Sequence, residues 1–576
     1  MDRSVRCYRT AALCAVFVLV AVPSRSHADW PSNGARMTVI GTSSASTAFY
    51  SAAVASDKSL LVEFGLSPTT IIARRSMDGR PVPGWPVTEE AGAGTTGGLA
   101  PDQLGGCYYA LAAAGYVIVH HVLADGTSDP AWPPHGVTVC DAPGFKHAGL
   151  APDASGGVYV TWTDARDEPD HLPHAVFGSH LLSNGSVGAG WDAGGTRLAD
   201  LPDTTVAELG ACRPDGVGGV VVIAAQITDF GGPDRRTDGF LLHLSPHGSA
   251  PGWPAGGLFP PDLPLHSPFA FDTDGSGGAF VMWNDGAAGA HVQRFTGAGD
   301  IASGWPAGGR RIVADTTLTC IAFPFISDGG DGSRFILFSG TSGDLNEWAG
   351  FVGALDGSGT SLPGWPSPGC SIPTRLQSAM TLAPDGDEGC YALWGNFDVS
   401  GYLSPELRVL RVRSDGTVSP DFPGAGLVVC EGSGLRYQPS LAPDGGGGVY
   451  AVWLDSRDSP YGSYDVYATR IGPDGGALTD VPPSAPVAGA LTASPNPFTH
   501  DVSFALPPNS GDARLEIFDA SGRRVRSLAS RSGAAATGRM EWDGEDEAGR
   551  PVAPGLYLVR GQVGGSTVST RVVRVF

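Results

Sequence analysis

The chain has 576 residues and a formal net charge of −22 at pH 7. This acidic balance argues against nucleic acids and anionic lipid surfaces as general partners. Its 84 glycines and 47 prolines stand at turns between runs rich in Val, Ile, Tyr and Trp, and helical periodicity is absent beyond residue 25. We therefore expect an all-β protein.

Residues 1–28 have the pattern of a secretory signal peptide. A basic start is followed by an apolar stretch at 11–22, too short to span a bilayer comfortably, and by a small-residue cleavage site at 26–28. The basic residues are Arg3, Arg6 and Arg9. We expect an exported chain, secreted or held at the cell surface, that begins at Asp29 and has no transmembrane segment after cleavage.

Beyond the signal, an element built on an aromatic residue, usually followed by proline, recurs eight times at intervals of 47 to 62 residues. In seven of the eight copies a glycine follows four residues after the aromatic. The aromatic residues are Trp30, Trp85, Trp132, Trp191, Trp253, Trp305, Trp365 and Phe422. A flat ring at one point in each repeat is expected to pack neighbouring units together.

A second element alternates with the first: an aspartate turn, a glycine pair and an apolar run. In its four strongest copies a tryptophan stands nine residues after the aspartate, as in Asp153 and Trp162, Asp274 and Trp283, Asp385 and Trp394, and Asp444 and Trp453. Weaker copies begin at Asp57, Asp102, Asp215 and Asp328. A period near 50 residues with strand-like content is the signature of a β-propeller or another repeat architecture.

Each complete unit predicts four strands, with the aromatic element ahead of the fourth. The eighth unit stops after its third strand, whereas a spare aromatic element lies at residues 29–39. If that copy supplies the missing outer strand beside Tyr467, the ring has eight blades and no exposed edge. We therefore expect an eight-bladed β-propeller over residues 29–479, closed by an N-terminal strand.

A basic residue stands at the same place of the third strand in seven of the eight units, with Ala354 in the remaining one. The seven are Arg74, His121, His180, His243, Arg294, Arg411 and Arg470. They could form an anion-binding ring. We favour internal ion pairs that fix strand register, with the aspartate two residues after the second-strand tryptophan as partner, as in Asp164, Asp285 and Asp455.

Residues 480–490 are proline-rich and predict a linker. The remainder, 491–576, has short strands separated by Asp-Gly and Ser-Gly turns, which predicts a small β-sandwich. It contains Pro-Asn-Pro-Phe at 495–498, Ile-Phe-Asp-x-x-Gly-Arg-x-Val at 517–525, Trp-Asp-Gly at 542–544 and Pro-Gly-Leu-Tyr at 554–557.

These C-terminal motifs resemble the FlgD-type immunoglobulin-like domain and the similar C-terminal sorting domain of the type IX secretion system. The resemblance implies an Ig-like sandwich that acts as an export and surface-attachment signal in Gram-negative bacteria. It also implies that the export machinery is the partner of residues 491–576.

The propeller half resembles exported bacterial repeat proteins through Trp162-x-Asp164-x-Arg166 and Trp453-x-Asp455-x-Arg457. This resemblance implies no reaction. Asp164, Arg166, Asp455 and Arg457 are our candidate binding residues. We expect no catalytic motif and no cofactor. We also expect no metal, because the cluster of Asp170, His171 and His174 defines no metal geometry.

The sequence thus favours an exported, non-enzymatic propeller that binds a glycan or a protein and is delivered to the surface through its C-terminal domain. Two alternatives remain. One is a secreted hydrolase or lyase with its site in the propeller funnel, and the other is a structural surface protein.

Overall fold

A computed structural model describes residues 30–574 with gaps at 32, 38–49, 67–68, 91–94, 114, 145, 167–171, 203–204, 230–234, 255, 259–268, 285–289, 313–318, 321–324, 329–331, 342–347, 368, 374–379, 396–405, 433, 459–463, 477–491, 495–497, 499, 506–512, 520–522, 531–538, 554 and 564–565. The described residues contain strands and turns and no α-helix, as expected for an all-β protein. The chain divides into two compact units, Met1–Thr479 and Asp480–Phe576. The predicted signal peptide and linker lie outside the described residues.

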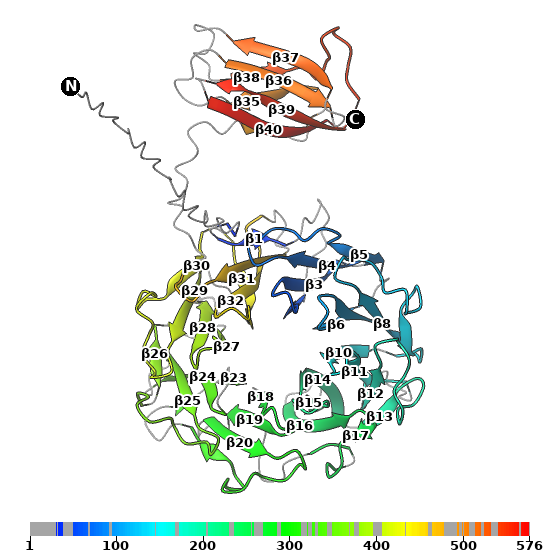
Figure 1. The fold of residues 1–576 in the computed structure, drawn as a ribbon, viewed down its shortest axis with the longest axis vertical. Coiled ribbons are helices and arrows are strands. Elements are labelled where there is room, and N and C mark those ends of the chain that lie inside the picture. The colour runs from blue at the N-terminus through cyan, green and yellow to red at the C-terminus, as the bar shows by residue number, and fades with distance from the viewer. Residues whose placement is uncertain are drawn as a thin grey trace, which may run out of the picture. The chain divides into compact units, whose positions relative to one another are not determined.

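In the first unit the described strands form eight antiparallel sheets, which Figure 1 shows arranged in a ring. We number them sheets 1 to 8 in chain order. Sheets 1 to 4 contain β2 (Tyr50–Val54), β3 (Leu60–Leu66), β4 (Thr69–Arg75) and β5 (Val87–Glu90); β6 (Thr95–Pro101), β7 (Cys107–Ala113), β8 (Tyr116–Val122) and β9 (Val137–Cys140); β10 (Lys146–Pro152), β11 (Val158–Asp164), β12 (Ala175–Leu181) and β13 (Thr196–Asp200); and β14 (Thr205–Pro214), β15 (Val220–Thr228), β16 (Arg236–Ser245) and β17 (Gly248–Ser249).

The second half of the ring repeats this pattern. Sheets 5 to 8 contain β18 (Phe269–Thr273), β19 (Ala279–Asn284), β20 (Ala290–Phe295) and β21 (Arg310–Arg311); β22 (Thr319–Cys320), β23 (Phe325–Asp328), β24 (Arg334–Thr341), β25 (Trp348–Leu355) and β26 (Cys370–Ile372); β27 (Met380–Pro384), β28 (Cys390–Gly395), β29 (Leu407–Val412) and β30 (Leu427–Cys430); and β31 (Arg436–Pro443), β32 (Val449–Asp455), β33 (Asp465–Ile471) and β1 (Ala35–Arg36). In sheet 6 the first strand is divided, so β22 and β23 both pair with β24.

Sheet 8 joins the two ends of the first unit. β1 pairs antiparallel with β33, with Ala35 opposite Ala468 and Arg36 opposite Tyr467. Arg36 Nη2 also lies 2.6 Å from Asp465 Oδ2. The predicted pairing of the N-terminal segment with the last unit is therefore present, and β33 is not left as an edge.

The core lies between neighbouring sheets. Every residue of β11 and of β32 is buried, because a second strand is covered on both of its faces. One hydrophobic cluster joins Val117 of sheet 2 to Val160 of sheet 3, and another joins Tyr159 of sheet 3 to Val222 of sheet 4. Sheets that meet face to face around a ring are the blades of a β-propeller.

The tryptophans of the aromatic element connect successive sheets, as the sequence predicted. In six of them the indole Nε1 donates a hydrogen bond to a carbonyl oxygen in the next sheet. The bonds are Trp30 to Met77 (2.9 Å), Trp85 to Ala124 (3.2 Å), Trp132 to Ser183 (2.9 Å), Trp191 to Pro246 (3.1 Å), Trp253 to Gly297 (2.9 Å) and Trp365 to Ser414 (2.7 Å). Each ring thus packs and bonds across the blade interface.

The second unit is a small sandwich of two sheets. One contains β34 (Thr492–Ser494), β35 (Val502–Ala505) and β38 (Arg539–Trp542), and the other contains β37 (Arg524–Ser530), β36 (Ala513–Asp519), β39 (Gly555–Val563) and β40 (Ser566–Arg574). Trp542 is fully buried with Phe504, Ile517 and Val559 in the core between the sheets. Its Nε1 donates to the Glu545 carbonyl oxygen at 2.8 Å, which ties the Trp-Asp-Gly turn to this core.

Candidate functional site

The basic residues of the third strands are held by carboxylates, but not by the ones that the sequence predicted. The nitrogen-to-oxygen distances are 2.7 Å for Arg74–Asp57, 3.0 Å for His121–Asp102, 2.7 Å for His180–Asp153, 2.8 Å for His243–Asp215, 2.8 Å for Arg294–Asp274, 2.8 Å for Arg411–Asp385 and 2.6 Å for Arg470–Asp444. The expected partners Asp164 and Asp455 are wrong, and Asp285 lies outside the described residues. Because β12 runs antiparallel to β11, His180 lies opposite Tyr159, close to the turn that Asp153 opens.

Each of these aspartates also stabilises its own turn. Asp153 Oδ1 accepts hydrogen bonds from the amides of Ser155 (2.7 Å) and Gly157 (2.5 Å), while Oδ2 lies against His180. The same pattern of amides two and four residues on recurs in the turns at Asp102, Asp215, Asp274, Asp385 and Asp444. Each of these seven basic residues thus has a carboxylate partner in its own sheet, and we assign them to the scaffold.

Sheet 6 departs from this pattern, because it carries Ala354 in place of the cation. Here Arg334, at the start of β24, is the buried basic residue. Its guanidinium lies 4.6 Å from the centre of the Phe280 ring in sheet 5, and its Nη2 donates to the Thr273 carbonyl oxygen at 3.1 Å. In sheet 6 the basic residue, Arg334, therefore stands on the second strand and not on the third, and it connects sheet 6 to sheet 5.

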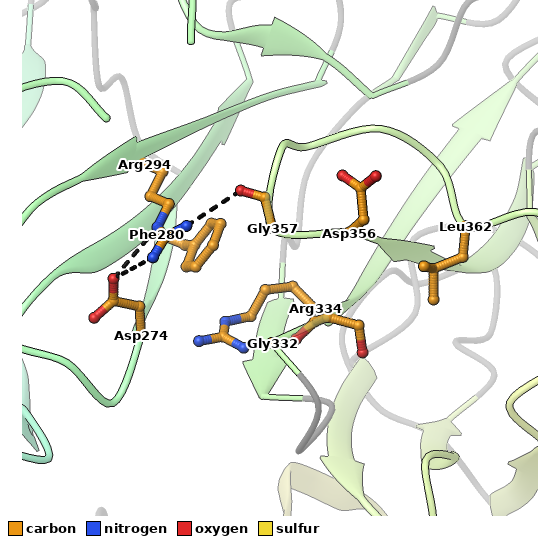
Figure 2. A pocket seen from close by; sticks show the side chains of 9 residues that line it. Asp274, Phe280, Arg294, Gly332, Arg334, Asp356, Gly357 and Leu362 are labelled. Atoms are coloured by element: carbon orange, nitrogen blue, oxygen red, sulfur yellow. Dashed lines mark hydrogen bonds and ion pairs between the residues drawn. The ribbon is translucent and has the colours of Figure 1, made fainter. Parts of the chain in front are cut away.

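A small cavity of about 250 Å³ lies at this place. Figure 2 shows Arg294 bound to Asp274 and to the Gly357 carbonyl oxygen on one side of it, and Arg334 and Asp356 on the other. Since these charged groups serve the contact between sheets 5 and 6, we assign the cavity to the scaffold.

Asp164 and Arg166, two of the predicted binding residues, form a clamp inside sheet 3. Asp164 is buried and accepts from Trp162 Nε1 (2.9 Å), Lys146 Nζ (2.9 Å) and Arg166 Nη2 (2.6 Å). Arg166 Nη2 also donates to the Gly194 carbonyl oxygen at 3.1 Å. The clamp joins the first and second strands to the turn that leads into β13.

Asp455 and Arg457 form the same clamp in sheet 8. Asp455 accepts from Trp453 Nε1 and Arg457 Nε, both at 2.9 Å. Arg457 Nη1 donates to the Asn33 carbonyl oxygen at 2.9 Å, so this clamp holds the N-terminal segment. Burial alone would raise the pKa of both aspartates, but the hydrogen bonds from their arginine and tryptophan partners keep each pKa below its usual value. A role of the four residues in ligand binding stays a prediction.

A larger cavity lies elsewhere, on the inner side of the ring. We call it the inner-strand pocket, because β2, β6, β10 and β14 of four successive sheets supply most of its lining, and it has a volume of about 830 Å³. Figure 1 shows β6, β10 and β14 at the inner side of the ring. Its apolar wall contains Leu99, Leu150, Leu172, Val206, Leu209 and Ile227.

A few polar side chains interrupt this wall. His147 on β10 and Glu208 on the neighbouring β14 are both exposed in it, as is Arg235, whereas Cys212 is half-buried. Although the imidazole reaches solvent, the surrounding pocket wall partly desolvates it, which lowers the pKa of His147 below its usual value of 6.5; the charge of Glu208 offsets this effect only in part. The imidazole is therefore neutral at pH 7, and Glu208 brings a negative charge to the pocket.

Sequence reasoning missed this pocket because its polar residues do not repeat. His147 and Glu208 each occur in one first strand, whereas the predicted positions recur from unit to unit. The predicted polar cluster at 163–174 is incomplete in the structure, because Asp170 and His171 lie outside the described residues. In the described part of the chain no group of three His, Cys, Asp or Glu side chains could hold a metal ion.

One known family matches part of the second unit. Residues 497–563 match the FlgD Ig-like domain, in agreement with the sandwich described above. A comparison with curated proteins gives no match. Within the described residues there is no helix with the length and hydrophobicity that crossing a bilayer requires.

Several solved structures resemble the chain at low identity. Prolyl oligopeptidase B from Galerina marginata shares 10% identity, with a TM-score of 0.38 and coverage of 72% of this chain and 56% of the peptidase. An α-L-arabinanase from Penicillium chrysogenum shares 12%, with a TM-score of 0.35 and coverage of 63% and 93%. PorZ, a surface component of the type-IX secretion system of Porphyromonas gingivalis, shares 11%, with a TM-score of 0.21 and coverage of 91% and 81%. The chain thus spans little more than half of the peptidase, and likenesses this distant carry no functional argument.

Proposed function

We propose that this chain is an exported binding protein in which an eight-bladed β-propeller holds a glycan or protein ligand without transforming it. The inner-strand pocket carries this proposal. At about 830 Å³ it has the size of a ligand site, and it combines an apolar wall with few polar groups. Four neighbouring sheets build it, so the ring itself preorganises the site.

In this proposal the N-terminal and C-terminal segments direct export and sorting. Residues 1–28 direct export, residues 29–479 form the propeller, residues 480–490 are the linker, and residues 491–576 act as a type IX sorting domain. The FlgD match and the sandwich support the domain assignment. Deletion of 491–576 tests the sorting role: we expect the truncated protein to accumulate in the periplasm, and unchanged secretion would contradict it.

Filling the pocket tests the binding role. Ala211 is exposed in the pocket, so Ala211→Trp should abolish binding of the glycans or proteins that the unmodified chain captures from arrays. Ala154→Trp, at an exposed turn position of sheet 3, is the matched control and should bind normally. Equal binding by both variants would place the ligand outside the pocket.

The hydrolase or lyase alternative is favoured by one observation, the presence of His147 and Glu208 in the same pocket. A neutral imidazole and a carboxylate can each act as a general base. Cys212 is a poor nucleophile, because burial raises the pKa of its thiol to about 11. Turnover of a captured ligand that stops in His147→Gln would replace the binding proposal with this alternative.

A further inference from the structure

We propose that the inner-strand pocket takes an extended peptide segment that places a basic side chain against Glu208. This inference rests on the proposed function, because it names the class of ligand for the same pocket. Three features of the pocket support it: a carboxylate with no hydrogen-bond or ion-pair partner among the described residues, an aliphatic wall and an accessible main chain.

Glu208 supplies the charge. It is exposed on β14, and no hydrogen bond or ion pair joins it to another residue in the part of the chain that the structure describes. Its neighbour His147 is neutral at pH 7, and Arg235 already interacts within the chain. A lysine or arginine of the ligand would form a charge-assisted hydrogen bond with Glu208, and the net charge of −22 would attract it from a distance.

The wall suits aliphatic side chains better than sugar rings. Leu99, Leu150 and Leu209 come from three neighbouring first strands. Tyr50 is the one aromatic residue among the described lining residues, and its hydroxyl is held in sheet 8 by Ser440 Oγ and the Val452 carbonyl oxygen, each at 2.9 Å. A sugar presents C–H faces that pack on flat rings and many hydroxyls that need polar partners, and this wall offers few of either.

The backbone of β14 is accessible to a ligand at the β-bulge in this strand. Between Leu209 and Cys212 the register shifts, so Gly210 and Ala211 face Ile223 alone, and both are exposed in the pocket. A corresponding shift in β6 brings Gly98 to the lining. Because these residues have little or no side chain, a ligand can approach the backbone closely, and backbone hydrogen bonds are how extended peptides gain affinity.

The test uses the full chain and an immobilised library of acetylated, amidated hexapeptides, so that terminal charges play no part. We expect the peptides that bind to carry Lys or Arg beside aliphatic residues. Glu208→Gln should weaken the best of them by about tenfold or more, the loss of one charged partner. Asp387→Asn removes an 86% exposed carboxylate from a turn of sheet 7 and should leave binding within about twofold.

Each other outcome is informative. Peptides that bind Glu208→Gln as well as the unmodified chain would overturn the contact with a basic side chain. Binding of glycans alone, lost in Ala211→Trp, would overturn the peptide class and leave the proposed function standing. Absence of binding to both the peptide library and a glycan array would overturn both. Because Glu208 is exposed, Glu208→Gln should melt at the unmodified temperature, which separates lost binding from lost folding.

Discussion

Gly34 lies directly against the indole ring of Trp453, at the opposite end of the propeller sequence. A Cβ atom on Gly34 would stand 2.4 Å from Trp453 Cη2, and the residue has φ of +82°. Three other glycines lie in the same way against a tryptophan of their own sheet. An added Cβ would stand 2.3 Å from the Trp162 ring at Gly195, 2.3 Å from the Trp283 ring at Gly309 and 2.4 Å from the Trp394 ring at Gly426. The glycine of the aromatic element therefore leaves the space that the tryptophan of the aspartate-turn element occupies.

Gly34→Ala should loosen the closure of the ring. The added methyl group would overlap the Trp453 ring and would also strain a backbone with positive φ, so we expect a loss of about 2–4 kcal/mol in the free energy of unfolding. Urea denaturation measures it. Gly304→Ala is the control, because Gly304 has the same φ of +82° and open space around a Cβ. Equal losses in the two variants would show that the contact with Trp453 contributes nothing.

Arg457→Met should release the N-terminal strand. Arg457 donates to the Asn33 carbonyl oxygen, and its loss also removes a partner of buried Asp455. We expect destabilisation of about 1–3 kcal/mol and faster amide hydrogen exchange at residues 33–37. Arg166→Met removes the equivalent arginine of sheet 3 and should destabilise the chain without faster exchange at those residues. Unchanged exchange in Arg457→Met would contradict a role in closure.

Glu63→Gln should make the chain more stable at alkaline pH. Burial raises the pKa of Glu63 to about 8 from its usual 4.5, although the Gly98 amide offsets part of that effect. Since the folded state binds the proton more tightly, stability falls as pH rises from about 4.5 to about 8 and then levels off. Glu63→Gln should remove this decline, which unfolding measured between pH 4 and pH 9 would detect. The exposed Glu208→Gln should keep it.

Asp215→Asn should cost about 1–3 kcal/mol at pH 7. Asp215 Oδ2 lies 2.8 Å from His243 Nε2, and Oδ1 accepts from the amides of Val217 and Gly219. Burial opposes ionisation of Asp215, but the bond with His243 and the two amides hold its pKa below the usual 3.8.

The stabilisation by Asp215 is therefore present above pH 3.8 and is lost as the pH falls through the lower folded value. Chemical denaturation of both proteins at pH 7 and at pH 2 is the measurement. A difference that persists undiminished at pH 2 would contradict a contribution from the charge of Asp215.

Much of the fold could be predicted because its signals are local and repeat. The spacing of Asp153 and Trp162, the glycine pair between them and the aromatic element after the third strand each describe one turn or one strand. Turn chemistry depends on neighbours in sequence, so these elements could be placed without knowing the ring. The spare copy at Trp30 even predicted which two ends would pair.

Partner assignments could not be predicted in the same way. His180 was expected to bind an aspartate after the tryptophan, but the antiparallel register brings it to Asp153 at the other end of β11. The role of Arg334 in sheet 6 could not be predicted either. It stands on the second strand, whereas the other basic residues stand on the third, so it does not belong to the repeated pattern.

The sequence alone determined a repeated four-stranded unit, its closure by residues near Trp30 and a separate C-terminal sandwich, because hydrophobic alternation and turn residues act over a few positions. Tertiary structure decided which carboxylate meets which cation and where a cavity remains. Those depend on how four sheets come together around an axis, so His147 and Glu208 become neighbours only when β10 and β14 lie side by side in the ring.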